Sequence, residues 1–258
     1  MLGRYGPWAL VAGASEGIGA AFSRALAEAG FSLVLVARRP EPLEALAAEL
    51  RARGVEIETH ALDLAAPDLE ARLTAIADAR EIGLCVYNAA LSTIAPFLEV
   101  PLADKLRALD VNARGPLVAA HVLGTRMAAR GRGGIVLVSS LTAFWGTAWI
   151  ATYGATKAFN LSLGEALARE LADRGVDVLV SCAGATSTPG FLATMRGKRA
   201  PAAMSADAVA RQTLRALPRR GAFVPGLFNR IAQFLLARLV PRRMAVRVMA
   251  GQTRRLLG

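Results

Sequence analysis

The chain has 258 residues, of which 54% are hydrophobic and 20% charged, enough for one large hydrophobic core. Its net charge of +11 is uneven, because residues 196–258 hold 14 of the 31 Lys and Arg residues but only one of the 20 acidic residues. No run reaches the ~18 apolar residues of a membrane-spanning helix, and the first strand begins too early for a secretion signal, so we expect neither a membrane-spanning nor a secreted protein.

Short apolar runs alternate with helical patterns along most of the chain. We predict strands near 8–12, 32–37, 55–60, 83–87, 133–139 and 176–182, and helices near 17–29, 41–53, 67–79, 102–129, 152–173 and 205–217. Near-continuous apolar strands of this kind are typical of a parallel sheet with helices on both faces. The sequence therefore predicts a doubly wound, Rossmann-like α/β domain. Cys85 and Cys182 lie in or beside such runs and are expected to be reduced.

A glycine-rich turn follows the first strand. Gly13, Gly17 and Gly19 form the pattern G-x-x-x-G-x-G before an Ala-rich helix. Glycines permit a tight turn and a close approach of the backbone, and the helix N-terminus offers free amides to a pyrophosphate. We predict a dinucleotide site here, to which Ser15 and Ile18 also contribute.

The second and third strands end in residues suited to the far end of a dinucleotide. Arg38 and Arg39 follow Ala37, where an acidic residue would bind a ribose 2′-hydroxyl. Arginine suits a 2′-phosphate instead, so NADP(H) is predicted in preference to NAD(H), although a solvated arginine pair would also explain the charges. Asp63 and Leu64 end the third strand and are assigned to the adenine end.

Three polar residues indicate acid–base chemistry. Tyr153 and Lys157 are four residues apart and share one face of a helix. The ammonium is expected to lower the pKa of the phenol, which would make Tyr153 an acid or base near neutral pH. Ser140, at a strand end, could hold a substrate oxygen beside it. For the Tyr–Lys pair alone, a half-buried tyrosine and a surface lysine remain an equally open interpretation.

Taken together, these motifs resemble the short-chain dehydrogenase/reductase family over about residues 7–195. The matching residues are Gly13, Gly17, Gly19, Asn88, Ala89, Asn112, Ser140, Tyr153, Lys157 and Gly184. The chain departs from the family pattern at Ala12, Tyr87, Ala90 and Ala183.

The resemblance implies a mechanism and further site residues. NADPH would deliver hydride to a carbonyl carbon while Tyr153 protonates the oxygen and Ser140 positions it. Lys157 would stabilise the phenolate and bind the nicotinamide ribose, and Asn112 would hold a water that links Lys157 to solvent. Thr188, with Thr186 as its rival, would hold the nicotinamide amide.

For the aromatic residues and the histidines, a purely structural role is an alternative to a functional one. Phe144, Trp145 and Trp149 lie between Ser140 and Tyr153 and either wall an apolar substrate pocket or anchor the loop. The two histidines, at 60 and 121, lack companion ligands, so they are assigned to packing, and no metal is predicted.

The basic tail forms the last part of the chain. Residues 185–200 are expected to close over the substrate. We assign residues 1–225 to the catalytic domain and 226–258 to a helical extension, with helices over 227–240 and 242–257 separated by Pro241. The extension could lie on an anionic membrane, bind an acidic protein partner, or pack on the body or a second subunit. No nucleic-acid reading element is recognisable.

The sequence therefore predicts an NADP(H)-dependent oxidoreductase that interconverts a ketone and a secondary alcohol. A hydrophobic, lipid-like substrate of the 3-oxoacyl or steroid type is expected, and the protein is predicted to be a cytoplasmic homo-oligomer, with peripheral membrane association left open. The alternative is a non-catalytic NADP(H)-binding sensor or scaffold that acts through the basic tail.

Overall fold

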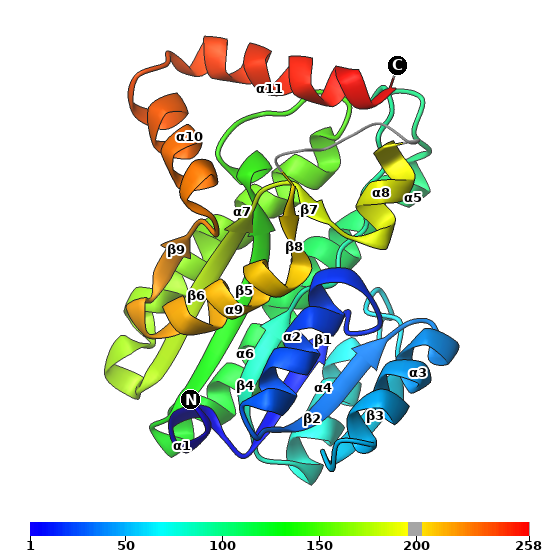
Figure 1. The fold of residues 1–258 in the computed structure, drawn as a ribbon, viewed down its shortest axis with the longest axis vertical. Helices are drawn as coiled ribbons and strands as arrows, with labels where there is room; N and C mark the ends of the chain where they lie inside the picture. The colour runs from blue at the N-terminus through cyan, green and yellow to red at the C-terminus, as the bar shows by residue number, and fades with distance from the viewer. Residues whose placement is uncertain (196–202, 258) are drawn as a thin grey trace.

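The computed structural model describes residues 1–195 and 203–257. Its centre is a seven-stranded sheet with the order β3-β2-β1-β4-β5-β6-β9 (Figure 1), in which every neighbouring pair is parallel. The strands are β1 (Trp8–Ala12), β2 (Ser32–Ala37), β3 (Ile57–Ala61), β4 (Ile82–Tyr87), β5 (Gly133–Ser140), β6 (Val176–Ala183) and β9 (Gly221–Phe223). The predicted doubly wound parallel sheet is confirmed, and its strand order reverses between β1 and β4, the point where ligands bind in such sheets.

Helices cover both faces of the sheet and bury a core on each. One core contains residues of α2 (Gly17–Glu28), α3 (Pro40–Arg51) and α9 (Ala206–Ala216). The opposite core contains residues of α4 (Leu69–Ala79), α6 (Gly115–Arg130) and α7 (Ala151–Glu170). The smaller elements are α1 (Leu2–Tyr5), α5 (Leu102–Leu109), α8 (Pro189–Met195) and a two-stranded sheet of β7 (Thr186–Ser187) and β8 (Met204–Ser205).

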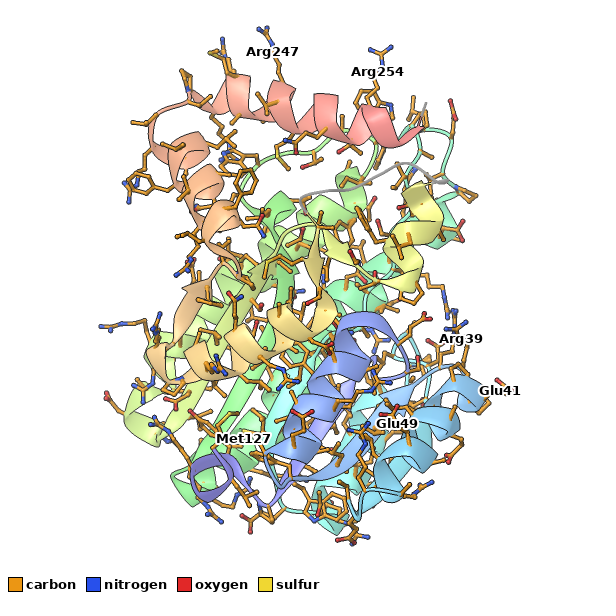
Figure 2. The ribbon with its side chains drawn as sticks, viewed as in Figure 1. Arg39, Glu41, Glu49, Met127, Arg247 and Arg254 are labelled. Atoms are coloured by element: carbon orange, nitrogen blue, oxygen red, sulfur yellow. The ribbon has the colours of Figure 1, made fainter. Side chains whose placement is uncertain are left out.

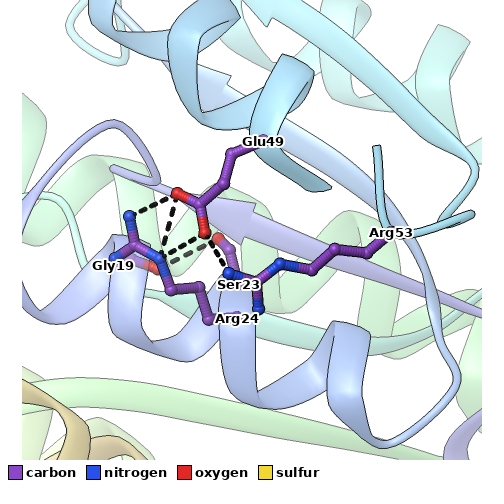
Figure 3. A network of polar contacts seen from close by, with 5 residues as sticks. All are labelled: Gly19, Ser23, Arg24, Glu49 and Arg53. Carbon is purple, nitrogen blue, oxygen red and sulfur yellow. Dashed lines mark hydrogen bonds and ion pairs between the residues drawn. The ribbon is translucent and has the colours of Figure 1, made fainter. Parts of the chain in front are cut away.

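Polar contacts join α2 to α3 (Figure 3). Arg24 donates to both carboxylate oxygens of Glu49, with the shortest contact 2.7 Å, and Arg53 reaches the same carboxylate at 2.8 Å. Within α2, Ser23 Oγ donates to the carbonyl of Gly19 at 3.0 Å. Partly exposed ion pairs of this kind contribute ~1 kcal/mol or less, so they join α2 to α3 without supplying much of the stability of the fold.

The helix predicted over 102–129 is present over residues 102–130, but it is not regular throughout. The structure has α5, then one wide π-helical turn over Asp110–Arg114, then α6. Pro116 has no N–H to donate to the carbonyl of Asn112 four residues earlier. That carbonyl accepts instead from Asn160 Nδ2 of α7 at 2.9 Å. Such bulges are common at functional sites, and this one holds a predicted site residue.

The two predicted tail helices are present as α10 (Leu227–Arg238) and α11 (Arg242–Leu257). They lie beyond the carboxyl ends of the strands, with α11 crossing the end of the molecule (Figure 1). Residues 196–202, which include most of the basic segment expected to close over the substrate, lie outside the described residues.

A buried carboxylate joins the N-terminal segment to the start of β6 and to the residue before β9. Asp177, at the start of β6, has no exposed surface. Its two oxygens accept from Tyr5 Oη, Arg4 Nη2 and Arg220 Nε, each at 2.5 Å. Burial, together with the neighbouring Asp177 carboxylate, raises the pKa of Tyr5. Three segments far apart in sequence therefore depend on one side chain.

We expect Asp177→Asn to lower the free energy of unfolding by about 2–3 kcal/mol, because an amide nitrogen would face donors that need an acceptor and charge-assisted hydrogen bonds would be lost. Urea unfolding followed by circular dichroism would measure the change. Asp173→Asn is the matched control, since Asp173 is exposed and should shift the midpoint little. Equal effects of the two substitutions would show that the buried cluster does not stabilise the fold.

Candidate active site

A cavity of about 1110 Å³ opens at the carboxyl ends of the strands, where the strand order reverses. Its walls come from the glycine turn after β1, from the ends of β2, β4, β5 and β6, and from the start of α7. The tail helices α10 and α11 also contribute lining residues. Chain segments from both ends of the sequence therefore meet at one site.

The glycine turn is shaped to bring backbone close to a ligand. Gly13 has a φ of +78°, a left-handed conformation that favours glycine. A Cβ on Gly19 would lie 1.9 Å from the carbonyl oxygen of Gly13, so no side chain fits there. Asn88 Nδ2, from the end of β4, donates to that same carbonyl at 3.0 Å. The turn is thus locked against β4 with the N-terminus of α2 behind it, an arrangement suited to a pyrophosphate.

Charged side chains gather at one end of the cavity. Arg39 Nη2 lies 2.9 Å from Glu16 Oε1, and both side chains are about half exposed. Asp63 accepts from the backbone of Ala65 and, at 2.6 Å, from Arg107 Nη2 of α5. These hydrogen bonds outweigh burial and hold the pKa of Asp63 below its usual value.

Arg107 was missed by the sequence reasoning. Its position on a helix gave no signal of contact with the end of β3, because that contact depends on how α5 packs. Arg38 also lines this end of the cavity, so three arginines surround the predicted adenine and ribose region.

Ser140 and Tyr153 meet on one wall of the cavity. A hydrogen bond with Ser140 lowers the pKa of Tyr153 in part, but burial raises it more, so the net pKa lies above the usual value of a phenol. The expectation that Lys157 would lower this pKa is wrong. The amine lies 5.4 Å from the centre of the Tyr153 ring and is directed at a backbone carbonyl instead.

Lys157 is almost completely buried, with 2% of its surface exposed. Its Nζ donates to the carbonyl of Val138 in β5 at 2.8 Å, and its own carbonyl accepts from Ser139 Oγ at 2.8 Å. Burial lowers the pKa of Lys157 to about 8. The amine therefore titrates close to neutral pH. The alternative interpretation of this position as a surface lysine is wrong.

Asn112 lies behind the cavity rather than in its wall, and it is fully buried. Its Oδ1 accepts from the backbone N–H of Leu91 at 2.7 Å, and its Nδ2 donates to the Leu91 carbonyl at 2.8 Å. Nδ2 also reaches Thr156 Oγ1 at 3.2 Å. The side chain thus holds the loop after β4, and its predicted role in binding a water stays a prediction.

The loop after β6 places both candidate threonines at the cavity. Thr186 Oγ1 donates to the carbonyl of Gly184 at 3.0 Å, and Thr188 Oγ1 accepts from the N–H of Phe191 at 3.2 Å. Only Thr188 also lies against the glycine turn, with its methyl group beside Gly17. Its place across from the turn suits a contact with bound cofactor.

The C-terminal helices form a roof over the cavity. Trp145 is 6% exposed and packs against Ala245 and Met249 of α11 while also lining the cavity. Phe144 packs against the same cluster but does not line the cavity, and Trp149 lies outside it. Trp145 therefore forms part of the pocket wall, and Phe144 and Trp145 together anchor the tail. Both interpretations of the aromatic loop hold in part.

Asn229 is a buried polar residue at the start of the tail helices. Asn229 Nδ2 donates to the carbonyl of Pro225 at 3.0 Å. Its side chain also lies against Gly184, because a Cβ added to that glycine would be only 2.7 Å from Asn229 Nδ2. The sequence offered one signal, an asparagine between apolar residues of a largely apolar helix. The other roof residues that line the cavity are Phe228, Ala232, Gln233, Leu236, Met249, Gln252 and Thr253.

Most predicted site residues line the cavity. Those that do are Gly13, Ser15, Gly17, Ile18, Arg38, Arg39, Asp63, Leu64, Asn88, Ala89, Ser140, Tyr153, Lys157, Gly184 and Thr188. Gly19 and Asn112 support it from behind.

Known proteins are similar to this chain in sequence and in shape. A family model described as short chain dehydrogenase matches residues 7–198. A 7beta-hydroxysteroid dehydrogenase of Collinsella aerofaciens is 35% identical over 195 residues, which are 75% of this chain and 74% of that protein.

Two solved structures are similar over nearly the whole chain. One, from a study of 7beta-hydroxysteroid dehydrogenase stereoselectivity, has a TM-score of 0.89 at 29% identity and covers 96% of this chain and 98% of the other. A short-chain dehydrogenase from Sphingobium yanoikuyae, in complex with NADPH, has a TM-score of 0.79 at 32% identity and covers 90% and 95%. Because the family model spans far more than half of the sequence, the chain belongs to the short-chain dehydrogenase family.

Proposed function

We propose that the protein is an NADP(H)-dependent oxidoreductase that interconverts a lipid-like ketone and its secondary alcohol. The observation that carries the proposal is the meeting of Ser140 and Tyr153 on one cavity wall, with the buried Lys157 on the same helix. A non-catalytic sensor needs no such set. We propose residues 1–225 as the catalytic domain and 226–258 as its roof.

The cofactor fits the residues present. The glycine turn leaves no room for side chains where a pyrophosphate would lie, and the α2 N-terminus faces it. Asp63 and Leu64 would hold the adenine end, Asn88 and Ala89 the central part, and Thr188 with Gly184 the nicotinamide. NADPH, when bound, supplies hydride to the carbonyl carbon.

Side chains of the protein would bind the substrate carbonyl oxygen and supply its proton. Ser140 would hydrogen-bond the carbonyl oxygen, and Tyr153 would donate its phenolic proton as negative charge develops there. Tyr153 is protonated at neutral pH and can donate, although burial raises its pKa and so makes the free phenol a weaker acid. Lys157 Nζ is held by the carbonyl of Val138 rather than by the phenol, so the stabilisation of the phenolate by Lys157 that the family resemblance implies stays a prediction.

The substrate end of the cavity supports a hydrophobic ketone. Its lining includes Leu141, Trp145, Ile150, Leu236 and Met249, and an apolar wall with few polar groups favours an apolar ligand. The similarity to 7beta-hydroxysteroid dehydrogenases makes a steroid-type ketone the first candidate, with a 3-oxoacyl chain as the second.

A panel of carbonyl compounds with NADPH and NADH tests the proposal. We expect NADPH oxidation with steroid or long-chain oxo substrates, slower rates with NADH, and little turnover of a polar sugar. Comparable rates on a sugar and a lipid-like ketone would contradict the substrate assignment. Saturable NADPH binding without turnover of any ketone or alcohol would favour the sensor.

The Arg39–Glu16 ion pair leads to a prediction about cofactor affinity. Glu16 holds the guanidinium that a 2′-phosphate would use, so it competes with the cofactor. We expect Glu16→Gln to tighten NADP⁺ binding by about fivefold, ~1 kcal/mol, and to leave NAD⁺ binding nearly unchanged. Isothermal titration with both nucleotides measures this difference.

Glu41→Gln is the matched control, because Glu41 is an exposed acid on the next helix, near Arg39 at the edge of the molecule (Figure 2). It removes the same charge without breaking the ion pair. If both variants tightened NADP⁺ binding equally, general charge rather than competition for Arg39 would be the cause. If neither did, Arg39 would have no part in phosphate binding.

We also propose a homo-oligomer, since α5, α6 and α7 expose large apolar residues that do not line the cavity. These residues are Leu102, Leu106, Leu109, Leu117 and Phe159. Light scattering after gel filtration would test for a second copy on this surface. The cytoplasmic location stays a prediction.

A further inference from the structure

Helix α10 is apolar on two sides. Its inward side, with Asn229, Ala232 and Leu236, lines the cavity. Its outward side exposes a row of large apolar residues whose exposed fractions run from 44% to 70%. These residues, which we call the outer face, are Leu227, Phe228, Ile231, Phe234, Leu235 and Leu239. Their spacing of three and four residues places them on one stripe of the helix.

The outer face is larger than the scattered apolar residues of an ordinary surface, and contiguous apolar patches mark interaction sites. Within the described residues nothing covers it. Phe228 belongs both to the outer face and to the cavity lining. The apolar surface therefore continues into the mouth of the candidate active site.

Exposed positive charge lies on both tail helices, beside the outer face on α10 and along α11. Arg230 and Arg238 are exposed on α10 itself, and Arg243, Arg247 and Arg254 are exposed on α11. Arg247 and Arg254 point away from the body of the protein (Figure 2). The sequence from residue 208 to the C-terminus contains no acidic residue. The partner of this surface must therefore combine apolar material with negative charge.

A second copy of the chain fits poorly. In a two-fold contact through α10, the same patch lies on both subunits, so the two sets of tail arginines would face each other without acids to neutralise them. An anionic bilayer supplies both requirements, since its acyl region accepts the apolar stripe and its headgroups attract arginine.

The geometry excludes a spanning arrangement for α10. It has 12 residues, about 18 Å at 1.5 Å per residue, against a hydrocarbon core of ~30 Å. Among the described residues, no helix is both long enough and apolar enough to cross a membrane. A helix of this length can bind a bilayer only by lying in its surface.

We propose that the outer face of α10, together with the exposed arginines of α10 and α11, docks on the surface of an anionic membrane. A lipid-like substrate would then pass from the bilayer past Phe228 into the cavity. Only this route rests on the proposed function, because docking itself requires no reaction. Failure of the reductase assay and failure of membrane binding are therefore separate results.

Co-sedimentation of the full chain with vesicles tests the docking. We expect the protein to pellet with vesicles of equal parts phosphatidylcholine and phosphatidylglycerol at low salt, and to stay in solution with phosphatidylcholine alone. Binding should weaken at about 1 M NaCl, where the Debye length falls to ~3 Å. Failure to pellet with the anionic vesicles at low salt would overturn the proposal.

Two double variants identify the surface. Ile231→Ser with Phe234→Ser removes apolar area that does not line the cavity, and should weaken vesicle binding by more than about a hundredfold. Arg243→Gln with Arg247→Gln removes two exposed charges and should weaken it by about thirtyfold. Both variants should keep the reductase activity of the wild type on a water-soluble ketone and its unfolding midpoint.

Arg215→Gln with Arg219→Gln is the matched control, because it removes two exposed arginines near the end of α9, away from α10 and α11. It should bind vesicles as the wild type does. If it lost binding as fully as the tail variants, total charge rather than this surface would be responsible. If Ile231→Ser with Phe234→Ser kept vesicle binding, or instead dissociated an oligomer, the outer face would not be a membrane site.

Discussion

Tyr153→Phe is expected to lower kcat for ketone reduction by ~10²–10⁴, the range that general acid catalysis contributes. The substitution removes only the hydroxyl that would protonate the substrate oxygen, and the ring can keep its packing. NADPH affinity should change little, because the residues assigned to the nucleotide are elsewhere in the cavity. Single-turnover reduction and fluorescence titration of NADPH would separate the two quantities.

Tyr87→Phe is the matched control for this prediction. Tyr87 is a second buried tyrosine, and its hydroxyl donates to the carbonyl of Val111 at 2.7 Å without lining the cavity. Its loss should cost ~1 kcal/mol of stability and leave the rate within a few-fold. If Tyr153→Phe reduced ketones within about tenfold of the wild type, Tyr153 would not be the proton donor.

The sheet and the cofactor end of the site could be predicted from the sequence because both depend on local patterns. Buried parallel strands read as continuous apolar runs, and β1, β2, β4, β5 and β6 lie within a residue or two of their predicted positions. The glycine turn likewise requires its residue types locally, since Gly13 adopts a positive φ and Gly19 touches the backbone.

Other features depend on packing and were missed. The π-helical turn had one signal, Pro116, but the sequence could not show that Asn160 would take the carbonyl of Asn112. The place of the tail was left open because α10 is apolar on two sides, and periodicity alone does not say which side faces the body. Both features need knowledge of which helix lies opposite.

The error over the pKa of Tyr153 has a similar origin. A spacing of four residues places Lys157 on the same side of α7 as Tyr153, but it does not determine where the amine points. Nζ bonds Val138 of β5, and burial then shifts both groups toward their neutral forms. Tyr153 is therefore protonated at neutral pH, and its phenolate is disfavoured by burial.

Burial of the Lys157 amine lowers the stability of the folded protein by a measurable amount. Lys157 has a pKa of about 8 in the folded protein, against 10.5 for an ordinary lysine. The difference corresponds to about 3 kcal/mol of destabilisation at pH 7, at ~1.4 kcal/mol per pKa unit. Because the folded pKa is the lower one, the unfolded chain binds more protons between these values, and this contribution to stability rises as the pH increases from 8 towards 10.5.

Lys157→Met is therefore expected to abolish most of the activity and yet stabilise the protein by about 2 kcal/mol at pH 7. That figure is the ~3 kcal/mol of relieved charge burial less ~1 kcal/mol for the lost hydrogen bond to Val138. Urea unfolding of both proteins at pH 7 and pH 10 tests the cause, because the advantage of the variant should shrink at the higher pH as the wild-type amine becomes neutral. A variant less stable than the wild type at pH 7, or an advantage that does not depend on pH, would show that Lys157 is not held as a strained buried cation. Retention of wild-type ketone reduction would remove Lys157 from the proposed proton chemistry.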